Sequence, residues 1–102
     1  MNKKRLIVAF SGPSNSGKTT AIVKVSSILN DGGFKVCIIK HDPKDKAVFD
    51  REGKDSFKFS QTGADVAVVS PNKTTLFKKS TSNIDEIVEL FQDFDYLLVE
   101  GL

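Results

Sequence analysis

The most informative segment of the chain is a loop framed by glycines and followed by a lysine and a hydroxyl. It matches the pattern G-x-x-x-x-G-K-S/T as Gly12-Pro13-Ser14-Asn15-Ser16-Gly17-Lys18-Thr19, with Thr20 next. Glycines lack the Cβ that would keep the backbone from wrapping around a polyphosphate, so successive N–H groups can face the anion. Lys18 would reach the β- and γ-phosphates, and the Thr19 hydroxyl would bind Mg²⁺. We therefore predict that residues 12–20 bind nucleotide phosphates and that Lys18 is also catalytic.

Two acids follow other apolar runs and could complete this site. Asp42 comes after residues 34–40, and Glu100 with Gly101 ends residues 94–101. Ligands of open parallel sheets gather beyond the carboxyl ends of the strands. We expect catalytic and metal roles for both acids, and a Gly101 N–H that can approach the γ-phosphate. The alternatives are that Asp42-Pro43 only starts a turn and that Glu100 is a surface acid.

Apolar periodicity predicts the elements that must position these residues. Buried strands are expected over residues 5–10 and 34–40, and another apolar strand over residues 94–101. Its residues 95–99 should lie beside residues 6–10 in the middle of a sheet. Helices are expected from Ala21 to the glycines after Asp31, from Gly53 to Gln61, and after an Asn83/Glu86 starting box. A hairpin over 66–70 and 74–78 makes the sheet mixed. The fold class is α/β, a three-layer fold like that of phosphate-loop NTPases with a mostly parallel sheet.

Length and composition limit the class of protein. The 102 residues form one domain at most, small for a nucleotide fold, so we expect a chain that is incomplete at its C-terminus. A net charge of +2 is too small to indicate a nucleic-acid or membrane partner. No stretch approaches the ~20 apolar residues that cross a bilayer. Cys37 lies in an apolar run with no second thiol, so we expect it to be buried and inert, in a cytoplasmic protein.

Residues 41–53 are polar and rich in charge. They could cover the triphosphate or dock an anionic partner molecule. Equally, such a run can be a solvated face with no role in binding. The residues leave these readings open.

Three groups of segments together resemble one family. They are residues 12–20; Ile39-Lys40-His41-Asp42 with Glu52-Gly53-Lys54-Asp55-Ser56 and Thr62-Gly63-Ala64; and Leu98-Val99-Glu100-Gly101. In this order they resemble the molybdopterin-guanine dinucleotide biosynthesis protein B family (MobB). Two features depart from it, because Asp42-Pro43-Lys44 stand where members often have further histidines, and because the family continues past the Val-Glu-Gly segment. We therefore expect the residues that read the guanine base to be absent.

The resemblance implies a GTP-binding protein with weak GTPase activity that uses Mg²⁺. It would assist the molybdopterin guanylyltransferase step of molybdenum-cofactor biosynthesis, with other enzymes of that pathway as partners, as a homodimer. A second hypothesis is an adaptor that presents GTP or cofactor to a partner enzyme. A third is a small-molecule kinase, but Arg5 and Arg51 are the only arginines and cannot build an arginine-rich lid. A nickel-type metal-insertion GTPase is disfavoured by a single histidine and a single cysteine.

Overall fold

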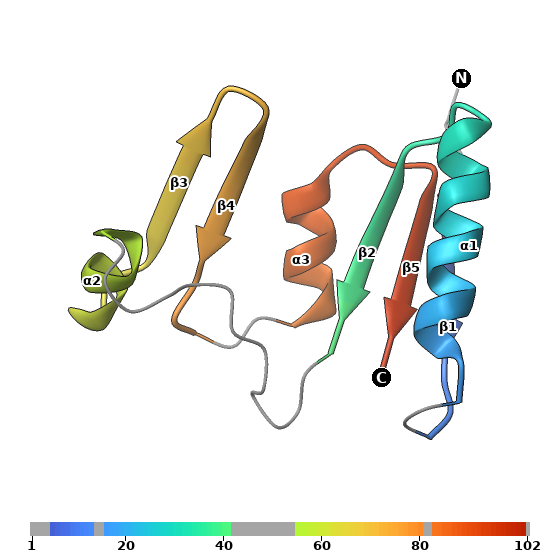
Figure 1. Cartoon of the computed structure of the whole chain (residues 1–102), viewed down its shortest axis with the longest axis horizontal. Coiled ribbons are helices and arrows are strands. Elements are labelled where there is room, and N and C mark those ends of the chain that lie inside the picture. Colours follow the sequence, from blue (N-terminus) through green and yellow to red (C-terminus); the bar gives the residue numbers. More distant parts are fainter. Residues whose placement is uncertain (1–4, 14–15, 42–54, 81–82, 102) are drawn as a thin grey trace. The chain divides into compact units, whose positions relative to one another are not determined.

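The computed structural model describes residues 5–13, 16–41, 55–80 and 83–101. Their elements in chain order are β1 (Leu6–Phe10), α1 (Lys18–Asp31), β2 (Val36–Lys40), α2 (Asp55–Gln61), β3 (Val66–Ser70), β4 (Lys73–Phe77), α3 (Ile84–Phe91) and β5 (Tyr96–Glu100) (Figure 1). The chain forms two compact units, residues 1–45 with 87–102, and residues 46–86. The expectation of one domain over 1–102 stays a prediction.

The first unit contains a parallel three-stranded sheet with β5 at its centre. The strand order is β1-β5-β2, and both outer strands run parallel to β5. The expected pairing of the first and last strands of the chain is thereby confirmed. Glu100 lies opposite Phe10 on one side and opposite Lys40 on the other. All three strands therefore end at the same edge of the sheet.

Burial differs sharply between the central strand and β1. Leu97 and Leu98 of β5 are 0% exposed, and because successive side chains of a strand point to opposite faces, both faces of β5 are covered. Leu6 and Ile7 of β1 are 52% and 59% exposed. The prediction that residues 5–10 form a buried strand is correct for the strand but wrong for its burial. The reason is position, because within the described sheet β1 has a neighbour on one side only and α1 packs mainly on β5 and β2.

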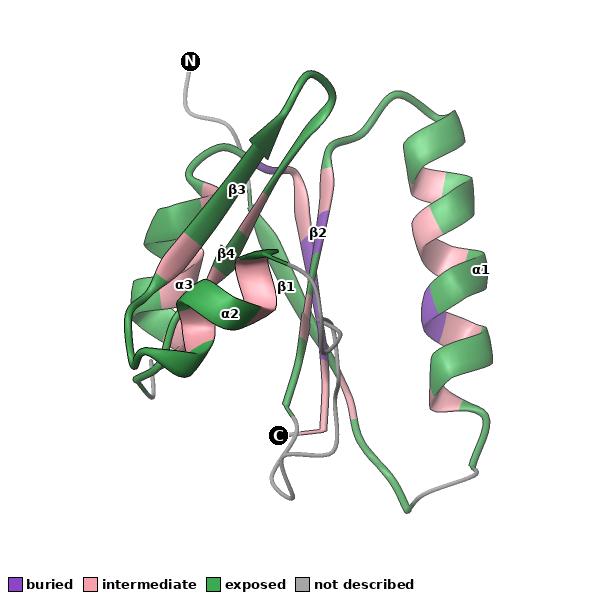
Figure 2. Cartoon of the chain, turned by 60° about the vertical axis from the view of Figure 1, so that its left-hand side comes forward, coloured by how far each residue is buried: buried purple, intermediate pink, exposed green. Residues whose placement is uncertain are grey.

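Helix α1 packs against β5 and β2 and covers one face of the sheet. In Figure 2 its less exposed segments turn toward the strands. Ile22 is buried there, whereas Ile28 is 70% exposed. Six residues at 100° each place Ile28 about 120° around the helix from Ile22, away from the sheet. The predicted glycine stop is confirmed: Gly33 has φ 88°, and the N–H of Phe34 donates to the carbonyl of Leu29 at 3.1 Å.

The second unit contains α2 and a hairpin. Strands β3 and β4 pair antiparallel, with Ser70 opposite Lys73, so that Pro71-Asn72 forms the turn. The hairpin is confirmed, with β4 beginning one residue earlier than expected. We expected it to make the parallel sheet mixed, but the described strands form a three-stranded parallel sheet and a separate two-stranded one. Pairing across a tight turn is local and does not require the other sheet.

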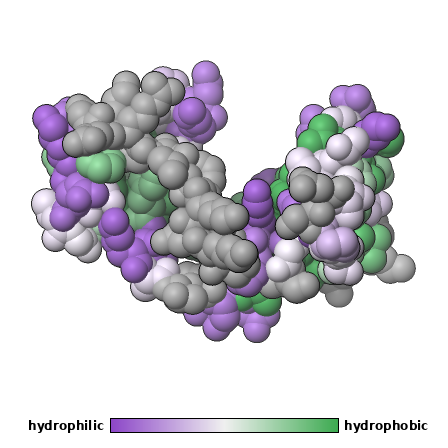
Figure 3. All heavy atoms as spheres, turned by 60° about the horizontal axis from the view of Figure 1, so that its bottom comes forward, coloured by the Kyte–Doolittle hydropathy of each residue, from purple (hydrophilic) through white to green (hydrophobic). Residues whose placement is uncertain are grey.

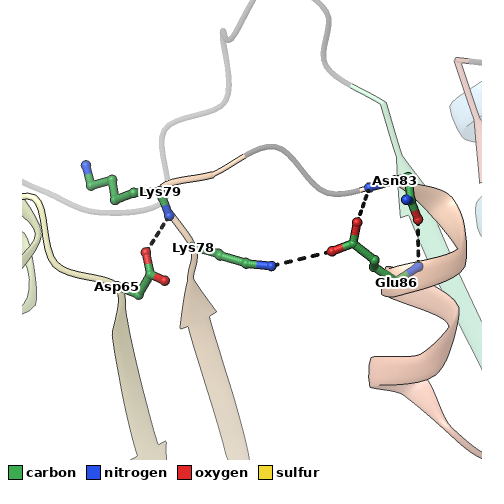
Figure 4. Close-up of polar contacts among 5 residues, drawn as sticks. All are labelled: Asp65, Lys78, Lys79, Asn83 and Glu86. Carbon is green, nitrogen blue, oxygen red and sulfur yellow. Dashed lines mark hydrogen bonds and ion pairs between the residues drawn. The ribbon is translucent and has the colours of Figure 1, made fainter.

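Polar contacts order the ends of the hairpin and the start of α3 (Figure 4). The N–H of Glu86 donates to the Asn83 Oδ1 at 2.9 Å, and the N–H of Asn83 donates to the Glu86 Oε1 at 3.4 Å. This reciprocal pair is the predicted helix-starting box. Glu86 also pairs with Lys78 at 3.8 Å, and the N–H of Lys79 donates to the Asp65 Oδ1 at 2.8 Å. The Asp65 side chain, before β3, therefore bonds the backbone just after β4 and joins the two ends of the hairpin.

Other apolar side chains also lie at the surface. They include Val23 of α1, Phe59 of α2, Val69 of β3 and Leu76 of β4. Figure 3, which looks onto the lower side of Figure 1, shows hydrophobic patches between hydrophilic ones. Exposed apolar groups are common singly, but several on one small unit raise the free energy of the uncovered surface. No helix among the described residues has the length and apolar character to span a bilayer.

Cys37 lies inside β2 and is buried, as predicted. Burial raises the pKa of its thiol, because the charged thiolate is poorly solvated there, and the nearby Lys35 charge offsets part of this effect. The thiol is therefore kept protonated and unreactive at neutral pH.

Candidate nucleotide-phosphate site

The carboxyl edge of the parallel sheet brings together the segments that the sequence singled out. Since Phe10, Lys40 and Glu100 share one register, the residues that follow them leave the sheet side by side. These are Ser11 at the start of the glycine loop, His41, and Gly101. In Figure 1 the arrowheads of β2 and β5 end together at this edge. It is where ligands of open parallel sheets bind.

The glycine loop connects this edge to the first turn of α1. Its described residues are 11–13 and 16–20. Gly12 and Gly17 have φ of 140° and 88°, values that other residues rarely adopt. A Cβ on Gly12 would also come within 3.2 Å of the Ser16 Oγ. Gly17 is the N-cap of α1, and its carbonyl accepts from the N–H of Ala21 at 3.0 Å, so the helix begins directly at the loop.

Lys18 folds back over this loop from the first position of α1. Its Nζ donates to the carbonyl of Gly12 at 2.5 Å. The ammonium group is thereby held beside Gly12, at the start of the loop, while Lys18 itself begins the helix. The N-terminal N–H groups of the helix carry the positive end of its dipole. A cation and a helix N-terminus at one place form a centre of positive potential, which suits a phosphate.

Thr19 and Glu100 meet across the sheet edge although 81 positions separate them. The Thr19 hydroxyl donates to the Glu100 Oε1 at 3.5 Å, which is long for such a hydrogen bond. A hydroxyl and a carboxylate this close offer two hard oxygen ligands of the kind that Mg²⁺ prefers. The described residues contain no group of three His, Cys, Asp or Glu side chains that could hold a metal ion. Two oxygens are few ligands, so the pair suits an ion that keeps water and phosphate ligands, as Mg²⁺ does.

Gly101 turns the chain directly after Glu100. Its φ is 85°, and a Cβ would lie 3.1 Å from the carbonyl oxygen of His41. The Gly101 N–H donates to the carbonyl of Phe10 at 3.5 Å, a long contact. We expected this N–H to approach the γ-phosphate, and that role stays a prediction. A phosphate contact would have to replace the weak bond to Phe10.

His41 is the residue at this edge to which residue patterns assigned no role. Its backbone N–H donates to the Glu100 carbonyl at 2.9 Å, and its ring Nδ1 lies 3.0 Å from the Gly101 carbonyl. The signal available in the sequence was its place, the first residue after a strand that ends beside Glu100. A lone histidine in a polar run is a weak signal without the strand register.

Several predicted site residues have no described contacts that would test them. Ser14, Asn15 and Asp42 lie outside the described residues. Pro13 and Thr20 are exposed, at the loop and in the first turn of α1. Their assignment to phosphate binding, and that of Asp42 to catalysis and metal, stay predictions.

A parallel sheet, a glycine loop that leads from its edge strand into a helix, and an acid at the end of the neighbouring strand define an α/β protein of the phosphate-loop type. The family model of molybdopterin guanine dinucleotide synthesis protein B (MobB) matches residues 7–102. The chain belongs to this family.

Curated relatives agree with this assignment. A putative molybdopterin-guanine dinucleotide biosynthesis adapter protein of Methanocaldococcus jannaschii is 30% identical over 97 residues, which is 93% of this chain and 40% of that protein. The adapter protein of that name from Haemophilus influenzae is also 30% identical, over 99% of this chain and 59% of its own length. The chain thus spans about half the length of the curated relatives it matches.

Solved structures agree as well. The crystal structure of Bacillus subtilis MobB matches with a TM-score of 0.77 at 28% identity, over 97% of this chain and 61% of the other. A crystal structure of molybdopterin-guanine biosynthesis protein B matches with a TM-score of 0.68 at 31% identity, over 96% and 60%. The predicted α/β fold and the predicted family are confirmed.

Proposed function

We propose that the chain is a GTP-binding accessory protein, a weak GTPase at most, in molybdopterin guanine dinucleotide biosynthesis. It would assist the guanylyltransferase that attaches GMP to molybdopterin. Membership of the MobB family and the printed names of the relatives support the pathway. The site at the carboxyl edge supports the nucleotide.

One observation carries the proposal: Lys18 and Thr19 are neighbours in the first turn of α1, and Thr19 meets Glu100 of β5. The Lys18 ammonium lies over the loop at Gly12, and Thr19, the next residue, lies 3.5 Å from an acid of the neighbouring strand. A nucleoside triphosphate with Mg²⁺ needs both a cation for its β- and γ-phosphates and oxygens for its metal. These two requirements are met at adjacent positions.

The Mg²⁺ ion would be held by few protein groups. Thr19 is the candidate for a direct ligand, and Glu100 and Asp42 would act through metal-bound water, because Mg²⁺ gives up its waters reluctantly. The ion would supply charge to neutralise the phosphates. The residues of the chain position the nucleotide: the loop N–H groups bind its phosphates, and Lys18 lies beside them.

A second candidate function is an adaptor whose hydrolysis is incidental. The relatives are named adapter proteins, which favours a role in presenting GTP or cofactor to a partner enzyme. Partner-stimulated turnover separates the two. Addition of the guanylyltransferase should raise GTP hydrolysis if the chain is an accessory GTPase, and should leave it near zero if the chain is only an adaptor.

Homodimer formation and a cytoplasmic location belong to the same proposal. The exposed apolar side chains of β1, at an edge of the described sheet, support self-association, since such edges pair readily with another chain. Sedimentation analysis tests this, and a monomer at micromolar concentration would count against the dimer.

The direct test is the Lys18→Ala variant in calorimetry with GTP and Mg²⁺. Loss of a charge-assisted contact should weaken binding by about 2 kcal/mol, roughly 30-fold. Lys24→Ala is the matched control, because Lys24 is exposed on the same helix and its replacement removes the same charge. Equal affinities of the parent and Lys18→Ala would refute nucleotide binding at this loop.

A further inference from the structure

His41 holds two successive peptide groups of the chain at the end of β5. Its backbone N–H donates to the Glu100 carbonyl at 2.9 Å, which continues the parallel ladder by one residue. Its ring Nδ1 lies 3.0 Å from the carbonyl oxygen of Gly101. His41, the residue that follows β2, thus contacts both the peptide group before Gly101 and the peptide group after it.

The chemistry of the second contact fixes the proton on the ring. A carbonyl oxygen has no hydrogen to give, so Nδ1 must carry the proton for this bond to form. His41 is then either the neutral Nδ1–H tautomer or the imidazolium ion. Neutral histidine in water prefers its proton on the other nitrogen, Nε2, so the contact with Gly101 selects a form that free histidine disfavours.

Without contacts from outside, the turn at Gly101 could take other conformations. Gly101 has φ 85°, and the His41 carbonyl lies 3.1 Å from where a Cβ of Gly101 would be. Glycine can adopt many backbone conformations, so a glycine turn needs outside contacts to stay in one. The two bonds from His41 provide these contacts. Glu100, whose carboxylate meets Thr19, is the residue directly before this turn.

We propose that His41 is a positioning residue that holds the Glu100–Gly101 turn, and with it the Glu100 carboxylate, beside Thr19. The inference rests on the proposed function, since it assigns to His41 a part in the Mg²⁺ side of the nucleotide site. His41 does not touch the nucleotide in this proposal. It acts through the backbone of Glu100 and Gly101.

The first test needs no nucleotide. His41 is the only histidine of the chain, so its ring nitrogens can be assigned without ambiguity by ¹⁵N NMR. At a pH where the ring is neutral, Nδ1 should show the protonated shift and Nε2 the unprotonated one. The Gly101→Ala variant, whose Cβ would press on His41, should shift the proton toward Nε2. A parent protein with the proton mainly on Nε2 would overturn the contact and the proposal.

The second test measures GTP affinity with Mg²⁺ and with EDTA in two variants. His41→Ala removes the ring donor and should lower the Mg²⁺-dependent gain in GTP affinity roughly threefold to tenfold, the effect of one hydrogen bond. Affinity in EDTA should stay that of the parent. His41→Asn keeps an N–H donor close to the place of Nδ1 and should restore most of the gain.

The outcomes separate this inference from the proposed function. If the parent does not bind GTP, or binds it independently of Lys18, the proposed function fails and takes the role of His41 with it. If Lys18→Ala loses GTP while His41→Ala keeps the full Mg²⁺-dependent gain, only the inference about His41 is wrong. A loss in His41→Ala that His41→Asn does not restore would also overturn it, because the donor would then not be the cause.

Discussion

Replacement of Glu100 by Gln should weaken the Mg²⁺ dependence of nucleotide binding and little else. The Glu100 Oε1 lies 3.5 Å from the Thr19 hydroxyl, so a cation on that hydroxyl has the carboxylate in its first or second shell. Two unit charges 4 Å apart attract by about 1 kcal/mol in water, and a divalent ion doubles this value. Since Glu100 is partly exposed, the water value applies, and the variant should lose about 2 kcal/mol, or roughly 30-fold.

The assay is a Mg²⁺ titration of GTP affinity, with EDTA as the reference. Gln keeps the size of the side chain and removes its charge, so packing at the end of β5 is preserved. Glu89→Gln is the matched control, because Glu89 is an exposed acid on α3 whose loss changes the net charge equally. Affinity in EDTA should be the same in all three proteins. A Glu100→Gln variant that titrates with Mg²⁺ as the parent does would refute the metal role of Glu100.

Two further predictions concern the core and the buried thiol. Leu98→Ala should lower the free energy of unfolding, measured in urea, by about 3 kcal/mol because Leu98 is fully buried. Leu6→Ala should lower it by less than about 1.5 kcal/mol because Leu6 is 52% exposed, and equal losses in the two variants would contradict the exposure of β1. Because the pKa of Cys37 is raised in the folded protein, the thiol of the unfolded chain loses its proton at lower pH, and the free energy of unfolding should fall as pH rises above 9.0. The Cys37→Ala variant should lack this contribution to the fall. Identical pH profiles of stability in the parent and the variant would contradict the prediction.

The sequence alone determined the features that depend on neighbouring residues. The glycine positions around Lys18, the Gly33 stop of α1, the Asn83–Glu86 box and the hairpin turn are all set by contacts within a few residues. Such contacts follow from residue type and spacing, which a sequence displays directly. The family followed from the same kind of evidence, because its motifs are short and lie in order along the chain.

Only the tertiary structure decided which of these segments meet and which are covered. β1 and β5 are both apolar runs, yet one is exposed and the other buried, because β5 lies between two neighbouring strands and α1 packs on it. The contacts of Thr19 with Glu100 and of His41 with Gly101 join residues 81 and 60 positions apart. No local pattern encodes them. They arise because parallel strands in one register bring their carboxyl ends to a common edge.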